Sequence, residues 1–195
     1  MREVSQHPEP VVVRHHLLTV DDYHRMAEAG ILGEDDRVEL IEGELIDMAP
    51  IGSEHAGKGI RLSSLLSTAL AGRAFVSQQN PLRLEEHSEP QPDIAVLRYR
   101  NDFYKASHPQ PADILLLIEI ADTTVRYDRE IKIPLYARHG IPEVWLIDLQ
   151  QERVEIYLQP SSEGYRQILR PGKNERIVLS LLPEVSILIA DLWPQ

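Results

Sequence analysis

The stretch ILLLIEI, residues 114–120, decides the fold, because it has the length of a strand buried on both faces and is apolar apart from one carboxylate. Residues 128–139 then predict a helix that Gly140 ends, and EVWLIDL, residues 143–149, predicts a second buried strand. Two strands joined by a helix in this way form a parallel pair with a right-handed crossover. Pro134 removes one backbone donor and crowds the preceding turn, so we expect a kink or a late helix start there.

Elements on both sides extend this unit. In chain order we expect a helix over 19–30 capped by Thr19, a hairpin over 37–48 with a Glu-Gly turn, a helix over 53–71 capped by Ser53, strands around 75–84 and 93–97, a loop over 98–112, and shorter strands at 154–158, 165–169, 177–181 and 185–189. This order predicts a mixed central β-sheet flanked by helices, with additional β-hairpins, in the α/β or α+β class.

The composition is that of an ordinary globular protein. Of 195 residues, 43% are hydrophobic and 26% are charged, which is enough for one domain with a real core. We expect a flexible lead-in over residues 1–18 and a single domain over 19–195. The chain has no cysteine, no apolar stretch long enough to cross a bilayer and no signal-peptide core at its start. We therefore expect a cytoplasmic protein with no membrane partner.

The charge balance is strongly acidic. The formal net charge is −11, from 31 acids and 20 bases, which argues against a protein that coats nucleic acid without specificity. It leaves a nuclease open, because acids can gather in a metal site while bases gather on one face.

Two of the acids stand in strand-like segments. Asp93 opens the strand predicted over 93–97, and Glu119 stands inside the apolar stretch 114–120, where an unpaired charge would be costly. Mg²⁺ prefers oxygen ligands and keeps several waters, so one or two protein carboxylates suffice to bind it. A metal bound by Asp93 and Glu119 is one interpretation, and a buried salt bridge is the main alternative.

The helix over 128–139 supplies further polar groups. Asp128, Lys132 and Tyr136 are spaced i, i+4 and i+8, so they lie on roughly one helical face. Lys132 could neutralise a phosphate and polarise an attacking water, and Tyr136 could position that water. The alternative, which is the commoner case for this spacing, is an ordinary i, i+4 pair between Asp128 and Lys132.

Two more residues could reach such a site. Glu39 lies in the first strand of the predicted hairpin, and His55 opens the helix over 53–71. The alternatives are a solvated strand face for Glu39 and a structural role for His55. The chain contains no P-loop, no dinucleotide glycine motif, no zinc-binding helix motif and no Gly-x-Ser-x-Gly elbow.

Taken together, these segments resemble the Uma-type restriction endonuclease family, a branch of the PD-(D/E)XK nuclease superfamily. The resemblance covers about 19–192, and its specificity lies in the order and spacing of the pieces. They are TVDDY (19–23), VELIEGEL (38–45), SEH (53–55), PDIAV (92–96), IEI (118–120), DREIKIPLY (128–136) and GIPEVWLID (140–148).

The resemblance implies a restriction-endonuclease-like fold and DNA cleavage dependent on Mg²⁺ or Mn²⁺. By motif match, Asp93 would be the first metal ligand and Glu119 the second. The superfamily usually places a lysine two residues after the second acid, where this chain has Ala121. Lys132 would take its place from the following helix. Glu39 matches an acid that many relatives carry ahead of the core sheet, and His55, Asp128 and Tyr136 would be accessory.

The predicted function is therefore a metal-dependent endodeoxyribonuclease. We expect a DNA substrate and a homodimer, since double-strand cleavage needs two sites. Five basic residues are expected beside the site as contacts for DNA phosphates: Arg98, Arg100, Lys105, Arg126 and Arg129. One alternative is a catalytically silent nuclease-fold dimer that acts as an interaction or regulatory module. Another is a metal-dependent hydrolase of RNA or of a small phosphoester.

Overall fold

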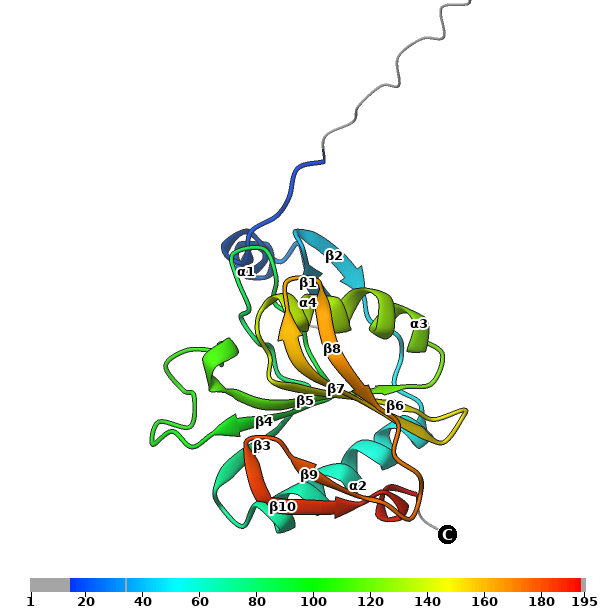
Figure 1. The fold of residues 1–195 in the computed structure, drawn as a ribbon. Helices are drawn as coiled ribbons and strands as arrows, with labels where there is room; N and C mark the ends of the chain where they lie inside the picture. The colour runs from blue at the N-terminus through cyan, green and yellow to red at the C-terminus, as the bar shows by residue number, and fades with distance from the viewer. Residues whose placement is uncertain (1–14, 34, 194–195) are drawn as a thin grey trace, which may run out of the picture.

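A six-stranded sheet runs through the centre of the computed structural model, which describes residues 15–33 and 35–193 (Figure 1). In sheet order, its strands are β3 (Ala74–Gln78), β4 (Ile94–Arg98), β5 (Ile114–Ala121), β6 (Glu143–Asp148), β7 (Arg153–Ser161) and β8 (Gly164–Leu169). Strands β5 and β6 pair in parallel, and every other neighbouring pair is antiparallel. The sheet is therefore mixed, and the parallel pair predicted from residues 114–149 is confirmed.

Both faces of the sheet are covered (Figure 1). One face carries helix α2 (Ser53–Leu70), the hairpin of β9 (Arg176–Leu179) and β10 (Leu182–Leu188), and the 3₁₀ helix η3 (Ile189–Leu192). Over the other face lie the short helix α3 (Val125–Tyr127), the π-helical turn η2 (Asp128–Lys132), helix α4 (Ile133–Arg138) and the hairpin of β1 (Val38–Ile41) and β2 (Glu44–Asp47). In the chain, helix α1 (Val20–Glu28) precedes that hairpin, and the 3₁₀ turn η1 (Pro111–Asp113) precedes β5. The predicted fold class is confirmed.

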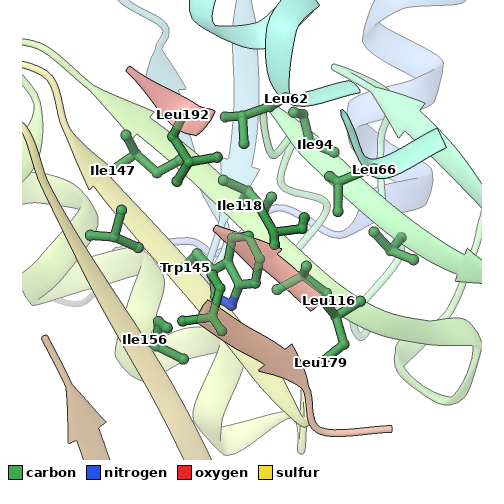
Figure 2. Packing of buried hydrophobic residues seen from close by; sticks show 14 of the residues in the cluster. Leu62, Leu66, Ile94, Leu116, Ile118, Trp145, Ile147, Ile156, Leu179 and Leu192 are labelled. Carbon is green, nitrogen blue, oxygen red and sulfur yellow. The ribbon is translucent and has the colours of Figure 1, made fainter. Parts of the chain in front are cut away.

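The alternation of side chains along β5 builds two hydrophobic layers. Ile118 points into the layer that contains Leu66 of α2 and Trp145 of β6 (Figure 2). Leu117 points into the opposite layer, which contains Tyr136 of α4. Successive side chains of a strand alternate between its faces, so the position two residues after Leu117 also faces α4. The carboxylate at position 119 therefore points towards the helix that follows the strand.

Local signals in the sequence explain most element ends. Thr19 caps α1 through a reciprocal capping box with Asp22, as predicted. The β1–β2 turn uses left-handed backbone at Glu42 and Gly43, with φ values of 50° and 84°. Ser53, expected to be the cap of α2, is instead its first residue, and the cap position falls on a glycine without a side-chain bond. Strand β3 also ends earlier than the predicted limit of residue 84.

Pro134 has the expected effect in an unexpected form. The helix begins early, at Val125, and widens into the π-helical turn η2 just before the proline. There the N–H of Ile133 donates to the carbonyl of Asp128, five residues back. A proline has no N–H to continue the regular ladder and crowds the preceding turn, so the backbone expands ahead of it instead of kinking.

The predicted lead-in, residues 1–18, falls mostly on 1–14, which lie outside the described residues; 15–18 have no regular secondary structure. That 19–195 form a single domain stays a prediction. Within residues 15–33 and 35–193, no helix combines the length and the apolar composition needed to cross a bilayer.

Candidate functional site

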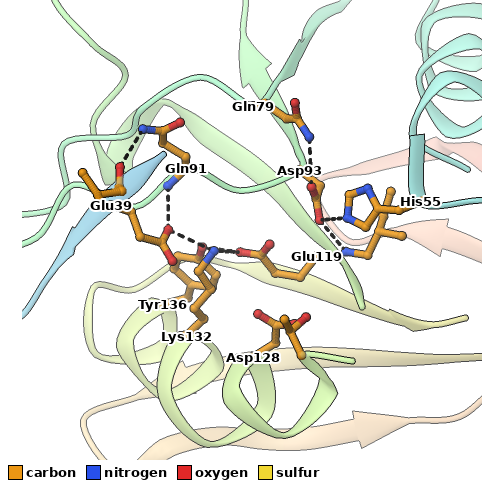
Figure 3. Close-up of polar contacts among 12 residues, drawn as sticks. Glu39, His55, Gln79, Gln91, Asp93, Glu119, Asp128, Lys132 and Tyr136 are labelled. Atoms are coloured by element: carbon orange, nitrogen blue, oxygen red, sulfur yellow. Dashed lines mark hydrogen bonds and ion pairs between the residues drawn. The ribbon is translucent and has the colours of Figure 1, made fainter. Parts of the chain in front are cut away.

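The acids predicted at the site, three of them buried, and the ammonium group of a lysine line a single pocket of about 130 Å³ at one end of the central strands. They come from four separate elements: Glu39 from β1, Asp93 from the bend before β4, Glu119 from β5, and Asp128 and Lys132 from η2. Figure 3 shows their side chains turned towards one another. Segments that are up to 93 residues apart in the sequence therefore meet in one acidic pocket.

Lys132 lies between two of these acids. Its Nζ is 3.1 Å from Glu39 Oε2 and 3.3 Å from Glu119 Oε1, and all three side chains are buried. Across residues 15–33 and 35–193, no ion pair joins Lys132 to Asp128 (Figure 3). The interpretation of Asp128 and Lys132 as an ordinary i, i+4 pair is therefore wrong. The helix delivers its lysine to carboxylates that belong to other elements.

Glu119 reaches the pocket because it lies on the α4 face of β5. Its Oε1 accepts a 2.5 Å hydrogen bond from the Tyr136 hydroxyl, so the group predicted as an accessory contacts this carboxylate directly. Burial raises the pKa of Glu119 to about 8, and repulsion from Asp128 and the other acids adds to the rise, while Lys132 partly offsets it. A carboxyl group held this way binds its proton tightly until a cation compensates its charge.

Asp93 is fixed by donors from three directions. Its Oδ2 accepts a 2.8 Å bond from the backbone N–H of Ile120 and lies 3.1 Å from His55 Nε2. Its Oδ1 accepts a weaker bond, 3.4 Å long, from the side-chain amide of Gln79. The bond to Asp93 is the main cause that raises the pKa of His55 above its ordinary value. His55 therefore contacts the predicted first ligand and orients it.

Asp128 adds a further acid from the π-helical turn. Its Oδ2 accepts a 2.8 Å bond from the Thr124 hydroxyl. Burial raises its pKa to about 6, while Lys132 and the Thr124 hydroxyl oppose the rise. Its carboxylate lines the same pocket as Asp93 and Glu119.

Glu39 is buried with 3% of its surface exposed, so the alternative of a solvated strand face is wrong. Its Oε2 accepts a 3.1 Å bond from the backbone N–H of Gln91, besides the Lys132 ion pair. The hairpin that carries Glu39 is thereby joined to the segment that carries Asp93, two residues after Gln91. Together with the backbone bond from the Glu89 N–H to the Leu40 carbonyl, this bond fixes β1 against the segment that precedes β4.

The donor set fits a hard divalent cation. Carboxylate oxygens are the ligands that Mg²⁺ and Mn²⁺ prefer, and the pocket concentrates them with a single buried ammonium group. Over the described ranges 15–33 and 35–193, no three His, Asp or Glu side chains form a ready metal-ligand group. Mg²⁺ keeps several waters, so Asp93 and Glu119 meet its need for one or two carboxylates.

Three of the basic residues expected beside the site lie elsewhere. Arg98 ends β4, roughly 16 Å along the strand from Asp93 at the usual rise per residue, and Arg100 and Lys105 follow in the loop beyond it. That part of the expectation is wrong, because the side chains leave from the opposite end of the strand.

The other two expected bases, Arg126 and Arg129, do lie near the pocket, on the α3–η2 segment. They are paired there with Glu130 and Glu155 respectively.

Sequence reasoning missed Tyr127, Gln79 and Gln91 as site residues. Tyr127 precedes Lys132 by five positions, a spacing that turns two side chains apart on a regular α-helix. In the π-helical segment both line the pocket. Pro134 was the available signal, since it predicts a disturbed turn here. Gln79 and Gln91 lie in irregular segments, where pattern gives no direction for a side chain.

The free energy of unfolding is expected to fall as pH rises from about 5 to about 8. The folded chain holds the Glu119 proton more tightly than the unfolded chain, whose glutamate has its ordinary pKa of 4.5. This stability is fully present below that value and is lost as pH rises through the folded pKa of about 8. Asp128 acts in the same direction over a lower range.

Urea unfolding without metal at several pH values measures this decline. In Glu119→Gln the fall in the free energy of unfolding with pH should be smaller than in the parent, by about 1.4 kcal/mol for each pH unit by which folding raises the pKa of Glu119. Glu143→Gln is the matched control, because Glu143 is a buried acid remote from the pocket that accepts bonds from Trp145 and the Ser180 N–H. Equal pH slopes for the parent and Glu119→Gln would contradict the prediction.

Comparison with known proteins gives one family and one fold. The Uma2 family model, described as "Putative restriction endonuclease", matches residues 20–190. The crystal structure of a "putative nuclease belonging to DUF820" from Anabaena variabilis ATCC 29413 superposes with a TM-score of 0.71 at 20% identity. The match covers 90% of this chain and 97% of that one, and shows a shared fold. No curated protein matches the chain.

Proposed function

This chain belongs to the Uma2 family, and on that premise we propose that it is a metal-dependent endodeoxyribonuclease. The observation that carries the proposal is the meeting of Glu39, Asp93, Glu119 and Lys132 in one pocket from separate elements. Buried carboxylates without full compensation are costly, and they are kept where they bind a cation or do chemistry.

Each residue has a role in this proposal. Asp93 and Glu119 supply carboxylate oxygens for one Mg²⁺ or Mn²⁺. When bound, such a cation stabilises charge on the phosphate and lowers the pKa of a water. Lys132 presents its ammonium to a phosphate oxygen, and Glu39 holds that ammonium in place through the 3.1 Å contact. Tyr136 fixes the orientation of Glu119 by its hydrogen bond.

The position of Lys132 supports its role as the displaced lysine. Ala121, which stands where the superfamily usually has the lysine, is a buried residue on the same face of β5 as Glu119. The Lys132 ammonium enters from η2 and lies 3.3 Å from Glu119 Oε1. An amine next to the second acid is thus supplied from a different element.

DNA cleavage is expected only with a divalent metal. Purified protein incubated with supercoiled and linear DNA should cut both in Mg²⁺ or Mn²⁺ and neither in EDTA, because the carboxylates of the pocket cannot by themselves stabilise charge on a phosphate. Gel electrophoresis over time measures the rate. RNA and a small phosphodiester, run in parallel, test the other substrate classes. Metal-independent cleavage, or none on any substrate, would contradict the proposal.

A homodimer in the cytosol remains part of the proposal, since cutting both strands of a duplex requires two sites. Light scattering across a range of protein concentrations tests it: a dimer mass is expected, and a monomer mass throughout would remove it.

A second candidate function is a catalytically silent interaction module. The observation that favours it is the closed pairing of Lys132 with Glu39 and Glu119, which by itself could serve as a buried structural network. The two candidates differ in their response to metal. If Mn²⁺ does not raise the melting temperature of the parent and Asp93→Asn changes stability alone, the silent module is the better account.

A further inference from the structure

The hydroxyl of Tyr127 is a buried donor without a partner. Its oxygen is shielded from solvent and makes no hydrogen bond to any of residues 15–33 and 35–193. Tyr127 lines the same pocket as Asp93, Glu119 and Lys132. The other buried polar atoms in this condition, within the same described ranges, belong to Glu89 and Trp193, and neither residue lines that pocket. An orphaned donor thus coincides with the proposed site.

Such a donor is costly to keep, and a polar group left unpaired in a native protein calls for an explanation. Other tyrosines of this sheet face show what a structural hydroxyl does. Tyr136 donates to Glu119 at 2.5 Å, and Tyr165 donates to the Ile141 carbonyl at 2.7 Å. The Tyr127 hydroxyl is likewise shielded from solvent but makes no bond to the described residues, which indicates that its partner arrives from outside the chain.

The surroundings define the chemistry of that partner. Burial, aided by repulsion from Glu39, raises the pKa of Tyr127 above its ordinary value, so the hydroxyl stays protonated and donates at neutral pH. The Lys132 ammonium has three N–H groups, of which Glu39 and Glu119 take two, so it keeps one for a phosphate and Tyr127 is a second donor in the same pocket. A ligand that approaches needs an acceptor oxygen for Tyr127 and must tolerate the acids, which a phosphate accompanied by a divalent cation does.

We propose that the Tyr127 hydroxyl donates a hydrogen bond to a non-bridging oxygen of the substrate phosphodiester, an inference that rests on the proposed nuclease function. The π-helical turn is what presents it, because Tyr127 and Lys132 face one pocket only through that widened segment. Tyr127 then contacts the phosphate beside the carboxylates that hold the cation. Loss of this hydroxyl weakens substrate binding and leaves the fold intact.

The test is Tyr127→Phe, with Tyr165→Phe as a matched structural control. Removing an orphaned hydroxyl leaves the melting temperature of Tyr127→Phe unchanged or raised, whereas Tyr165→Phe loses a bond and melts lower. With Mg²⁺, kcat/KM for DNA cleavage by Tyr127→Phe should fall about ten- to a hundredfold, the loss of one hydrogen bond to a charged group. Tyr165→Phe should retain parental cleavage at a temperature where it is folded.

A binding measurement separates this inference from the proposed function. Fluorescence anisotropy with a labelled DNA duplex in Ca²⁺, checked on a gel for intact strands, should show weaker binding by Tyr127→Phe than by the parent. If the parent binds but does not cleave, catalysis is wrong and the Tyr127 contact is still judged by this difference. Equal binding and cleavage by both proteins, or a Tyr127→Phe melting temperature as low as that of Tyr165→Phe, overturns the inference. A parent that binds no DNA overturns both.

Discussion

Lys132→Met is expected to lower the free energy of unfolding at pH 7 by about 3–5 kcal/mol, because breaking a buried ion pair from one side leaves uncompensated charge. Lys132 lies within ion-pair distance of Glu39 and Glu119, and none of the three side chains is more than 6% exposed. Methionine has a similar length and no charge, so the change isolates the loss of the ammonium. Urea denaturation gives the difference.

Two controls make the result specific. Lys58→Met removes a buried ammonium that donates to the Leu192 carbonyl, so it leaves no carboxylate behind and should cost less. Adding Glu39→Gln and Glu119→Gln to Lys132→Met should recover much of the loss, because the whole charged group is then absent. A cost below about 1 kcal/mol for Lys132→Met, with no recovery in the triple variant, would show that the cluster is not held by this ion pairing.

Asp93→Asn is expected to reduce the rate of DNA cleavage by about a hundred- to a thousandfold, because several kcal/mol of metal-derived stabilisation depend on its charge. The amide is nearly isosteric, and its carbonyl oxygen can still accept the 2.8 Å bond from the Ile120 N–H. Thermal stability without metal should therefore change little. The variant separates the charge of the side chain from its place in the fold.

The metal response gives an independent measurement. Saturating Mn²⁺, at about a hundred times its dissociation constant, should stabilise the parent by about 2.7 kcal/mol and leave Asp93→Asn unchanged. Asp191→Asn, a change at an exposed acid that does not line the pocket, should keep both the metal response and the cleavage rate. Full Mn²⁺ stabilisation of Asp93→Asn, or parental cleavage by it, would remove this residue from the metal site.

Periodicity and local chemistry predicted the parts of the fold that short segments control. The stretch 114–120 is apolar apart from Glu119 and has the length of a buried strand, and the helix and strand after it made the parallel pair foreseeable. The period of two fixes the face to which Glu119 belongs once Leu117 is known to be core. Thr19 and Asp22 determined the start of α1 because a capping box involves only neighbours.

Features that depend on distant contacts were beyond such reasoning. Glu39 looked like a member of an ordinary hairpin, and its burial follows from the docking of that hairpin against Gln91. Arg98, Arg100 and Lys105 lie near Asp93 in sequence, but the strand between carries them away from the pocket. Residues that are close in the sequence lie far apart in space when an extended strand separates them.

By itself, the sequence determined the elements, the mixed sheet and the identity of the acids and the lysine, because these follow from residue type and spacing over a few positions. Only the tertiary structure decided that Lys132 pairs with Glu39 and Glu119 and not with Asp128, and that Tyr127, whose hydroxyl has no partner among the described residues, lines the same pocket. The physical reason is that a buried charge or donor is satisfied by whatever the packed chain brings within about 3 Å, and packing is a property of the whole chain.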